Sequence, residues 1–220
     1  MRILIKRIVS PILQKASTLY LKKRRKYSYK KISVWVEPTV FPPFLTISTK
    51  LLLEFVEQLP IKDKTFLELG CGCGIISILA AQKGAKVTAT DINEIALSAL
   101  KQNAAANNVN IETMFSDLFE KLSAKSFDYI VINPPYYPKK PTSIAENAWF
   151  CGENYEYFER LFAELPLFAN TQNKIYIILS EDCDLDKIKT IARQYAMVFE
   201  LELEKKVVAE RNYIFRLRLL

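Results

Sequence analysis

Short apolar runs alternate with longer amphipathic segments from residue 61 to the end of the chain. Runs of four to eight residues rich in β-branched and aromatic side chains are typical of strands, whereas apolar positions three and four apart are typical of helices. Strands are predicted at 65–69, 86–90, 111–115, 127–132, 174–179, 198–204 and 213–220. Helices are predicted at about 75–82, 94–107, 155–165 and 185–195.

This order of elements predicts an α/β fold. Strands separated by helices of this length form an open, doubly wound, mostly parallel sheet, here of seven strands, and the last two strands add an antiparallel edge. Right-handed crossovers bring the carboxyl ends of the parallel strands to one rim, where such sheets bind ligands. With 220 residues and no internal repeat, the chain is expected to form one main domain at 38–220.

The charge is concentrated at the start of the chain. Residues 1–31 hold 11 of the 31 Lys and Arg residues and none of the 24 Asp and Glu residues, so the rest of the chain is slightly acidic. We expect 1–37 to be a basic arm, partly helical because apolar residues recur near helical spacing. Such an arm suits RNA, a ribosome or an anionic membrane face, and it equally suits a helix that packs on the body.

Other features exclude several classes of protein. The composition is 50% hydrophobic and 25% charged, and no apolar run approaches the roughly 18 residues of a membrane span. The chain has no histidine, which excludes Ser-His-Asp and Cys-His hydrolysis, and we expect no metal site. The start does not resemble a signal peptide, and two of the four cysteines lie inside a glycine cluster. We therefore expect no disulfide framework and a cytoplasmic location.

Three of the five glycines, Gly70, Gly72 and Gly74, fall between the first predicted strand and the first predicted helix. Glycine is costly inside regular elements, so this cluster indicates backbone angles or a close approach that a side chain would prevent. Exposed amides at the helix start add a site for acceptor groups. The spacing G-x-G-x-G differs from the dinucleotide fingerprint G-x-G-x-x-G, whose third glycine would be Ile75, and it lacks the P-loop lysine.

Acidic residues follow the next two predicted strands. Asp91 follows the second, where a carboxylate can accept both hydroxyls of a ribose, or can simply cap the next helix. Asp117 follows the third, where it can meet an adenine amino group or serve as a turn residue. The shared position at strand ends, together with the glycines, favours a site for a nucleoside cofactor.

The fourth predicted strand ends in the motif Asn133-Pro134-Pro135-Tyr136. A residue before proline is extended and proline cannot continue a ladder, so the amide of Asn133 should be held rigidly at the rim. An amide oxygen, free carbonyls and an aromatic ring suit a flat –NH2 group, which needs two acceptors and a stacking surface. The alternative is a proline-rich strand end that contacts nothing.

This order of motifs resembles the class I S-adenosylmethionine-dependent methyltransferases over 38–220, and their Rossmann-like fold is the one expected here. The motif N-P-P-Y resembles the signature of the subgroup that methylates nitrogen conjugated to a planar system. The resemblance implies S-adenosylmethionine as cofactor, with Glu68 beside its amino group. The cofactor-binding residues that it implies are Glu68, Gly70, Cys71, Gly72, Gly74, Asp91, Ile92, Asp117, Leu118 and Asn133.

Within that subgroup the chain is most similar to the HemK-like release-factor glutamine methyltransferases. Segments 40–43, 48–54 and 148–153 resemble stretches of that family. Cys151 stands where the family usually has a second glycine, and 44–49 replaces its usual arginine-acid-threonine segment. These departures leave cofactor binding and N-methylation as the expectation, whereas the release factor as substrate is less firmly implied.

The expected function is therefore N-methylation of a protein glutamine side chain. Asn133 and Pro134 would accept the two N–H bonds of the target nitrogen, and Tyr136 would stack on its plane. The expected substrate contacts are Pro135, Tyr136 and Trp149. The alternatives are methylation of an RNA or DNA base at adenine N6 or guanine N2, a nicotinamide-dependent oxidoreductase, and a non-catalytic module that binds nucleic acid. The expected partner is a macromolecular substrate, either protein or RNA.

Overall fold

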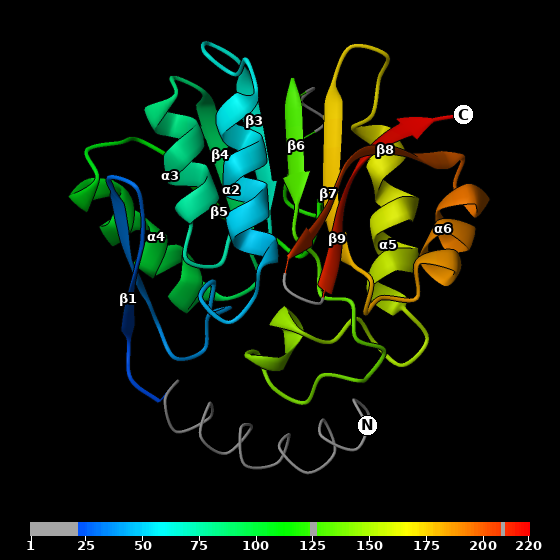
Figure 1. Cartoon of the computed structure of the whole chain (residues 1–220), viewed down its shortest axis with the longest axis horizontal. Coiled ribbons are helices and arrows are strands. Elements are labelled where there is room, and N and C mark those ends of the chain that lie inside the picture. The colour runs from blue at the N-terminus through cyan, green and yellow to red at the C-terminus, as the bar shows by residue number, and fades with distance from the viewer. Residues whose placement is uncertain (1–21, 124–126, 208–209) are drawn as a thin grey trace.

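The computed structural model describes residues 22–123, 127–207 and 210–220. A mixed sheet with helices on both faces forms the body, as Figure 1 shows. The strands are β1 (Arg25–Tyr29), β2 (Ile32–Val36), β3 (Thr65–Leu69), β4 (Lys86–Asp91), β5 (Glu112–Phe115), β6 (Tyr129–Ile132), β7 (Lys174–Ser180), β8 (Met197–Val207) and β9 (Glu210–Leu219). The α-helices are α2 (Ser48–Gln58), α3 (Ile75–Gln82), α4 (Glu94–Ala106), α5 (Glu156–Glu164) and α6 (Leu185–Gln194), and the 3₁₀ turns are η1 (Glu146–Ala148) and η2 (Leu165–Leu167).

The main sheet confirms the predicted fold. It has seven strands in the order β5-β4-β3-β6-β7-β9-β8. Strands β3 to β7 run parallel, and β9 and β8 add the antiparallel edge. The chain builds outward from β3 in one direction to β5 and then returns to β6 on the other side. This reversal between β3 and β6 is the position at which open α/β sheets form a ligand crevice.

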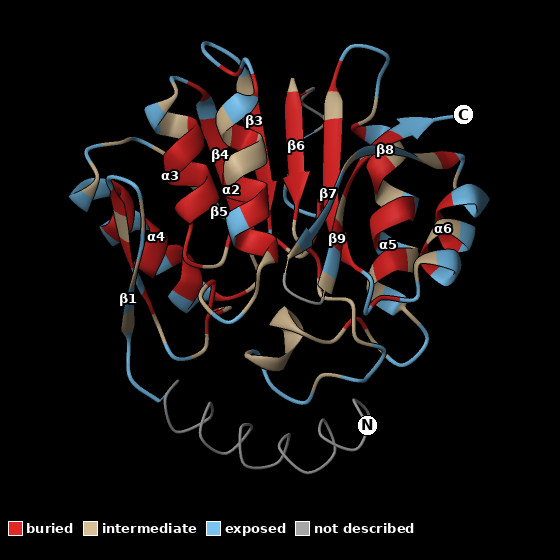
Figure 2. Ribbon diagram, viewed as in Figure 1, coloured by how far each residue is buried: buried red, intermediate tan, exposed pale blue. Residues whose placement is uncertain are grey.

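The two faces of the sheet belong to two apolar clusters. Strand β6 reads Tyr-Ile-Val-Ile, and all four side chains are buried. Tyr129 and Val131 lie in the cluster that contains residues of α2, α3 and α4, whereas Ile130 and Ile132 lie in the cluster that contains residues of α5 and α6. Strands covered on both faces lose the usual polar alternation, and this explains the continuous apolar runs in the sequence. Figure 2 shows the buried colour concentrated in these central strands and inner helix faces.

The structure adds elements that the sequence analysis did not predict. Helix α2 buries Leu51, Leu52, Leu53 and Val56. Strands β1 and β2 form a separate antiparallel pair, within the segment predicted as a basic arm. The expected partial helix of that arm falls on 1–21, outside the described residues, so the proposed arm and its boundary at residue 37 remain predictions.

The alternation of β2 explains how the strand pair packs. Ile32, Val34 and Val36 are buried, while Trp35 between them is 43% exposed. The buried set joins the cluster of α2, α3 and α4, and β2 contacts α3 and α4 directly. Strand side chains alternate between faces, so one face of β2 closes the core and the other faces solvent.

Two asparagines of α4 bind the backbone of β2. Asn103 accepts from Trp35 N at 2.8 Å and donates to Trp35 O at 2.9 Å. Asn107 binds the backbone of Ser33 in the same way: it accepts from Ser33 N at 3.3 Å and donates to Ser33 O at 2.8 Å. Residues four apart on a helix are separated by about 6 Å along its axis, and residues two apart on a strand by about 6.6 Å. The spacing of the two asparagines therefore matches that of their two partners on β2. The helix thereby replaces a third strand at this edge.

We predict unequal costs for removing these two amides. Asn103 is buried and also donates to Cys73 O at 3.1 Å, so Asn103→Ala leaves three backbone groups unpaired, of which the Cys73 carbonyl is buried. The expected loss in the free energy of unfolding is about 2–3 kcal/mol. Asn107 is partly exposed and water can replace it, so Asn107→Ala should cost about 1 kcal/mol. Urea unfolding followed by circular dichroism measures both, and equal small losses would contradict this account of the β2 edge.

Candidate active site

The carboxyl ends of β3, β4, β5 and β6 open into one cavity of about 600 Å³. This volume lies within the range of about 300–1,000 Å³ typical of small-molecule sites. The lining comes from the strand ends, from the segment after β2 that contains Thr39, Val40 and Phe41, and from a capping segment, residues 137–153. Figure 1 shows the capping segment, with η1, below the carboxyl ends of the strands. The cavity therefore occupies the rim that the sheet topology predicts.

The glycine turn follows β3, and its three glycines serve different purposes. All three have positive φ, between +51° and +75°. A Cβ at Gly70 would meet no atom within 4 Å, because this backbone faces open space. A Cβ at Gly74 would lie 2.1 Å from Leu100 Cδ1, because the turn approaches α4 closely there. Gly70 and Gly72 line the cavity, and Gly74 does not.

Glu68 lies in the cavity wall and is only 6% exposed. Its Oε2 accepts from Ser77 N at 2.8 Å and also from the Ser77 hydroxyl, and these bonds tie β3 to the first turn of α3. Burial raises the pKa of this carboxyl to about 8, the bonds from Ser77 oppose the rise, and the nearby charge of Asp91 adds to it. The fold therefore holds a carboxyl group here that is readily protonated near neutral pH.

Asp91 ends β4 and is held by two backbone amides. Its Oδ2 accepts from Gly72 N at 2.8 Å, and its Oδ1 accepts from Asn93 N at 2.9 Å. Burial raises the pKa of the carboxyl, and the backbone N–H bonds limit the rise. Each oxygen accepts one of these bonds, so lone pairs remain for a ligand that lies against the glycine turn. Ile92, the next residue, also lines the cavity.

Cys71 lines the cavity within the glycine turn. The side chain is buried and free of disulfide bonds. Burial raises the pKa of the thiol well above its ordinary value, and the charges of Asp91 and Glu68 raise it further. The group at this position is therefore a neutral thiol.

Asp117 is paired with an arginine that the sequence analysis missed. Arg160 Nη1, from α5, lies 2.8 Å from Asp117 Oδ2, and both residues line the cavity. The neighbouring Leu118, also in the lining, has a left-handed backbone with φ of +49°. Glu164 accepts from Phe119 N at 3.2 Å, so α5 fixes this loop at two points. The pairing of Arg160 with Asp117 depends on the approach of α5 to β5, for which the sequence gives no local signal.

The Asn-Pro-Pro-Tyr motif reaches the cavity only in part. Asn133 and Pro135 line it, whereas Pro134 is buried and Tyr136 lies outside the lining. The Asn133 side chain makes no hydrogen bond within the described part of the chain. The ring of Tyr136 lies 4.7 Å from that of Tyr137 and packs against the cluster of α5 and α6. The structure thus brings the amide, but not the aromatic ring, to the cavity wall.

The capping segment is tied to itself by backbone bonds. Tyr137 N donates to Trp149 O at 3.1 Å, and Cys151 N donates to Tyr137 O at 2.9 Å. The ring of Trp149 lies 4.9 Å from that of Phe41, across to the segment after β2. Trp149 itself is half-buried and does not line the cavity. The ring pair therefore joins the two segments that close the cavity.

Residues 22–123, 127–207 and 210–220 contain no group of three or more acidic or cysteine side chains placed to hold a metal ion. No helix in those same ranges combines the length and apolar character needed to cross a bilayer.

Comparisons with known proteins agree with this fold. A family model described as methyltransferase small domain matches residues 31–154, more than half of the chain. A Methanocaldococcus jannaschii protein with the provisional name protein N5-glutamine methyltransferase is 39% identical over 155 residues, covering 68% of this chain and 76% of that protein.

Solved structures at lower identity share the fold. A methyltransferase from Pyrococcus furiosus superposes with a TM-score of 0.65 at 22% identity, covering 94% of this chain and 98% of that one. The T. thermophilus 16S rRNA N2 G1207 methyltransferase, in complex with AdoMet and guanosine, gives a TM-score of 0.64 at 19% identity. That match covers 88% of this chain and 50% of that one.

We predict that an added methyl group separates the roles of two glycines. The methyl group added by Gly70→Ala would enter open space, so the only cost is the positive φ that alanine must adopt there. The expected loss in the free energy of unfolding is about 1–2 kcal/mol. Gly74→Ala adds a clash with Leu100 and should cost about 3–4 kcal/mol. A double-mutant cycle with Leu100→Ala, measured by urea unfolding, should show the losses to be less than additive. Full additivity would contradict the close contact.

We also predict a pH dependence of stability from Glu68. Because its pKa rises from 4.5 to about 8 on folding, the native state holds a proton that the unfolded state has released between those values. The contribution of Glu68 to the free energy of unfolding is therefore highest below about pH 4.5. It falls by a few kcal/mol as the pH rises to about 8. Glu68→Gln should flatten this slope and be more stable than wild type at pH 8.5. An unchanged slope in urea unfolding across this range would refute it.

Proposed function

This chain belongs to the methyltransferase small domain family and is an S-adenosylmethionine-dependent methyltransferase, and we propose that it methylates the side-chain amide nitrogen of a protein glutamine. The observation that supports a flat –NH2 group as acceptor most directly is the unpaired amide of Asn133 in the cavity wall, beside Pro135. The name of the M. jannaschii relative points to the same acceptor.

The residues of the cavity fit the cofactor. The open space at Gly70 is a backbone cradle that a Cβ would fill. Asp91 keeps lone pairs for hydroxyl donors, and Glu68 is an acid next to the glycine turn. We propose that Asp91 holds the ribose, Glu68 lies by the amino group, and Asp117 with Leu118 borders the adenine. When bound, S-adenosylmethionine supplies an electrophilic methyl group on a sulfonium.

The Asn133 oxygen has the principal role in positioning the acceptor. A glutamine amide is a poor nucleophile because the lone pair on nitrogen is delocalised. If the Asn133 oxygen accepts one N–H bond, and the carbonyl of Pro134, a residue buried outside the lining in this structure, becomes accessible to accept the other, the lone pair is oriented, and the positive charge that grows on nitrogen is stabilised. Holding the reacting atoms in line contributes roughly 7–11 kcal/mol. A strong base is unnecessary because the alkylated nitrogen becomes acidic, which agrees with a chain that has no histidine.

Tyr136 and Trp149 have less direct roles in this proposal. Tyr136 packs on Tyr137 behind the cavity wall, so it supports the Asn133 backbone, and stacking on the acceptor would require its ring to turn. Trp149 packs on Phe41 and so shapes the entrance that the acceptor crosses.

A second candidate acceptor is the amino group of an RNA base. The T. thermophilus structure that shares this fold is an rRNA methyltransferase with guanosine bound. An amide and an aromatic amino group share the flat –NH2 geometry that Asn133 would recognise. We favour the protein because the M. jannaschii relative matches 68% of this chain at 39% identity, whereas relatives named for ribosomal RNA, at 34–37% identity, match 42–48% of it.

We predict that Asn133→Ala reduces methyl transfer by about 10²–10³-fold, because an acceptor for charge that develops in the transition state is lost. Binding of S-adenosylhomocysteine, measured by calorimetry, should change little. Asn147→Ala is the matched control, since Asn147 is another asparagine of the cavity lining and should retain activity. Turnover by Asn133→Ala at the rate of wild type would refute the role of this amide.

The acceptor itself is tested by transfer from methyl-labelled cofactor in a cell extract. We expect the label in protein, at a glutamine located by peptide mapping without acid hydrolysis. We expect no label in RNA after nuclease digestion and chromatography. Label in a nucleobase instead would replace the glutamine assignment by the second candidate.

A further inference from the structure

The outer face of the β1–β2 pair holds an exposed tryptophan that the core does not need. Trp35 is 43% exposed, while Val34 and Val36 on either side are 1% and 2% exposed. The backbone of Trp35 is held by Asn103, so its indole ring adds nothing to that anchoring. An indole that faces solvent leaves a large apolar surface in water. Such a surface often marks a place where another molecule binds.

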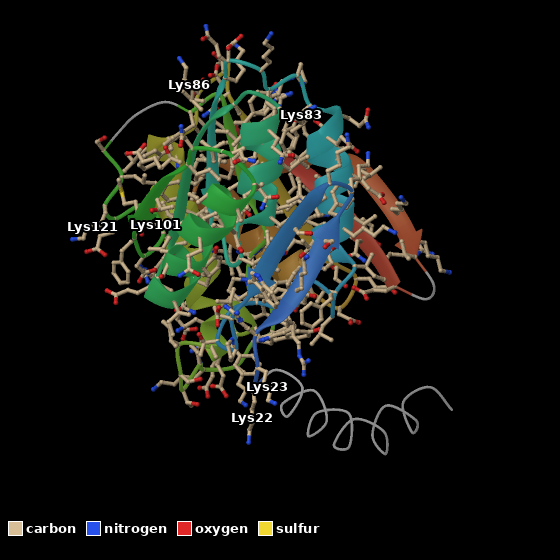
Figure 3. The ribbon with its side chains drawn as sticks, turned by 90° about the vertical axis from the view of Figure 1, so that its left-hand side faces the viewer. Lys22, Lys23, Lys83, Lys86, Lys101 and Lys121 are labelled. Atoms are coloured by element: carbon tan, nitrogen blue, oxygen red, sulfur yellow. The ribbon has the colours of Figure 1, made fainter. Side chains whose placement is uncertain are left out.

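Cations surround this ring. The guanidinium carbon of Arg24 lies 4.6 Å from the centre of the Trp35 ring, and Lys26 is the direct strand partner of Trp35. Lys22, Lys23 and Lys26 are exposed and have no ion pair within the described residues. Residues 22–36 contain no acidic side chain, and the first one after them is the half-buried Glu37. In Figure 3, Lys22 and Lys23 lie at the lower end of this strand pair and point into solvent.

The far end of the pair is different, because Lys30 is 2.6 Å from a carboxylate oxygen of Glu57. Lys31 at that end is exposed and has no ion pair among the described residues, so most, though not all, of the unpaired positive charge lies at the end that carries Trp35. Ser28 and Ser33 are cross-strand partners further along the pair, with their hydroxyl oxygens 2.7 Å apart. The surface thus combines one aromatic platform, several cations and two hydroxyl groups.

We propose that this face binds single-stranded RNA, with Trp35 and Arg24 stacking on bases and Lys22, Lys23 and Lys26 contacting phosphates. Aromatic rings among cations are the usual means of holding single strands, because bases stack and the backbone is neutralised. The serine hydroxyls offer partners for ribose 2′-hydroxyls. A bilayer would need several apolar side chains, and an acidic peptide would not need the indole.

The position of the face relates it to catalysis. Strand β2 continues directly into Thr39, Val40 and Phe41, which line the cavity. Bound RNA would therefore lie next to the active site. The inference does not depend on the acceptor, because a protein substrate can be presented on RNA and an RNA substrate can cross this face.

Fluorescence anisotropy of a fluorescein-labelled oligouridylate, titrated with the full-length protein, tests the proposal. Trp35→Ala should weaken binding about fivefold or more, because stacking is lost, and Trp35→Phe should restore most of it. Lys22→Gln with Lys23→Gln should lower the slope of log affinity against log salt by about 1.4. The control is Lys86→Gln with Lys121→Gln, two exposed lysines well away from the strand pair in Figure 3, which should bind as wild type.

Urea unfolding of each variant confirms that it is folded. Absence of binding by wild type at low salt, or unchanged binding by Trp35→Ala, would overturn the proposal. Equal affinity for the deoxy strand would overturn the assignment to RNA, and binding of phosphatidylserine vesicles that depends on Trp35 would assign the face to a membrane. Glutamine methylation by Trp35→Ala, assayed without RNA, should equal that of wild type, so failure here leaves the proposed acceptor intact.

Discussion

The buried amide of Asn103 connects three segments that are far apart in the sequence. Its oxygen and nitrogen bind the backbone of Trp35 in β2, and its nitrogen also reaches Cys73 O in the glycine turn. Asn93 caps the start of the same helix, and its side-chain nitrogen donates to Thr39 O in the cavity wall. Helix α4 thus fixes the outer strand pair, the glycine turn and the segment after β2 in one frame. The geometry of the cavity depends on these side-chain amides as much as on the sheet.

The electrostatics of the cavity are consistent with its ligand. Glu68 and Asp91 are desolvated, both have raised pKa values, and neither forms an ion pair with a basic side chain among the described residues. Asp117, by contrast, is neutralised by Arg160. A ligand that brings a cation and hydroxyl donors to the first two carboxyls relieves their desolvation. S-adenosylmethionine has both kinds of group, so in the proposed binding mode part of its binding free energy would come from pairing these two acceptors.

Sequence reasoning recovered the elements whose pattern is local. The main strands and the helices between them follow from apolar runs and helical spacing, and glycines, Asp91 and Asn133 at the strand ends follow from topology. The β1–β2 pair was missed because its charges obscured the alternation of Ile32, Val34 and Val36. The Arg160 partner of Asp117, the contact of Gly74 with Leu100 and the inward packing of Tyr136 arise from tertiary approach, which no window of sequence contains.

The neutral thiol of Cys71 has a further consequence. Thiolates are the softest and most reactive nucleophiles in proteins, whereas a protonated thiol attacks carbon poorly. Cys71 lines the cavity of an enzyme whose cofactor is an alkylating agent. Burial and the neighbouring negative charge both oppose ionisation of this sulfur, so we expect Cys71 to react poorly with the methyl group of the cofactor.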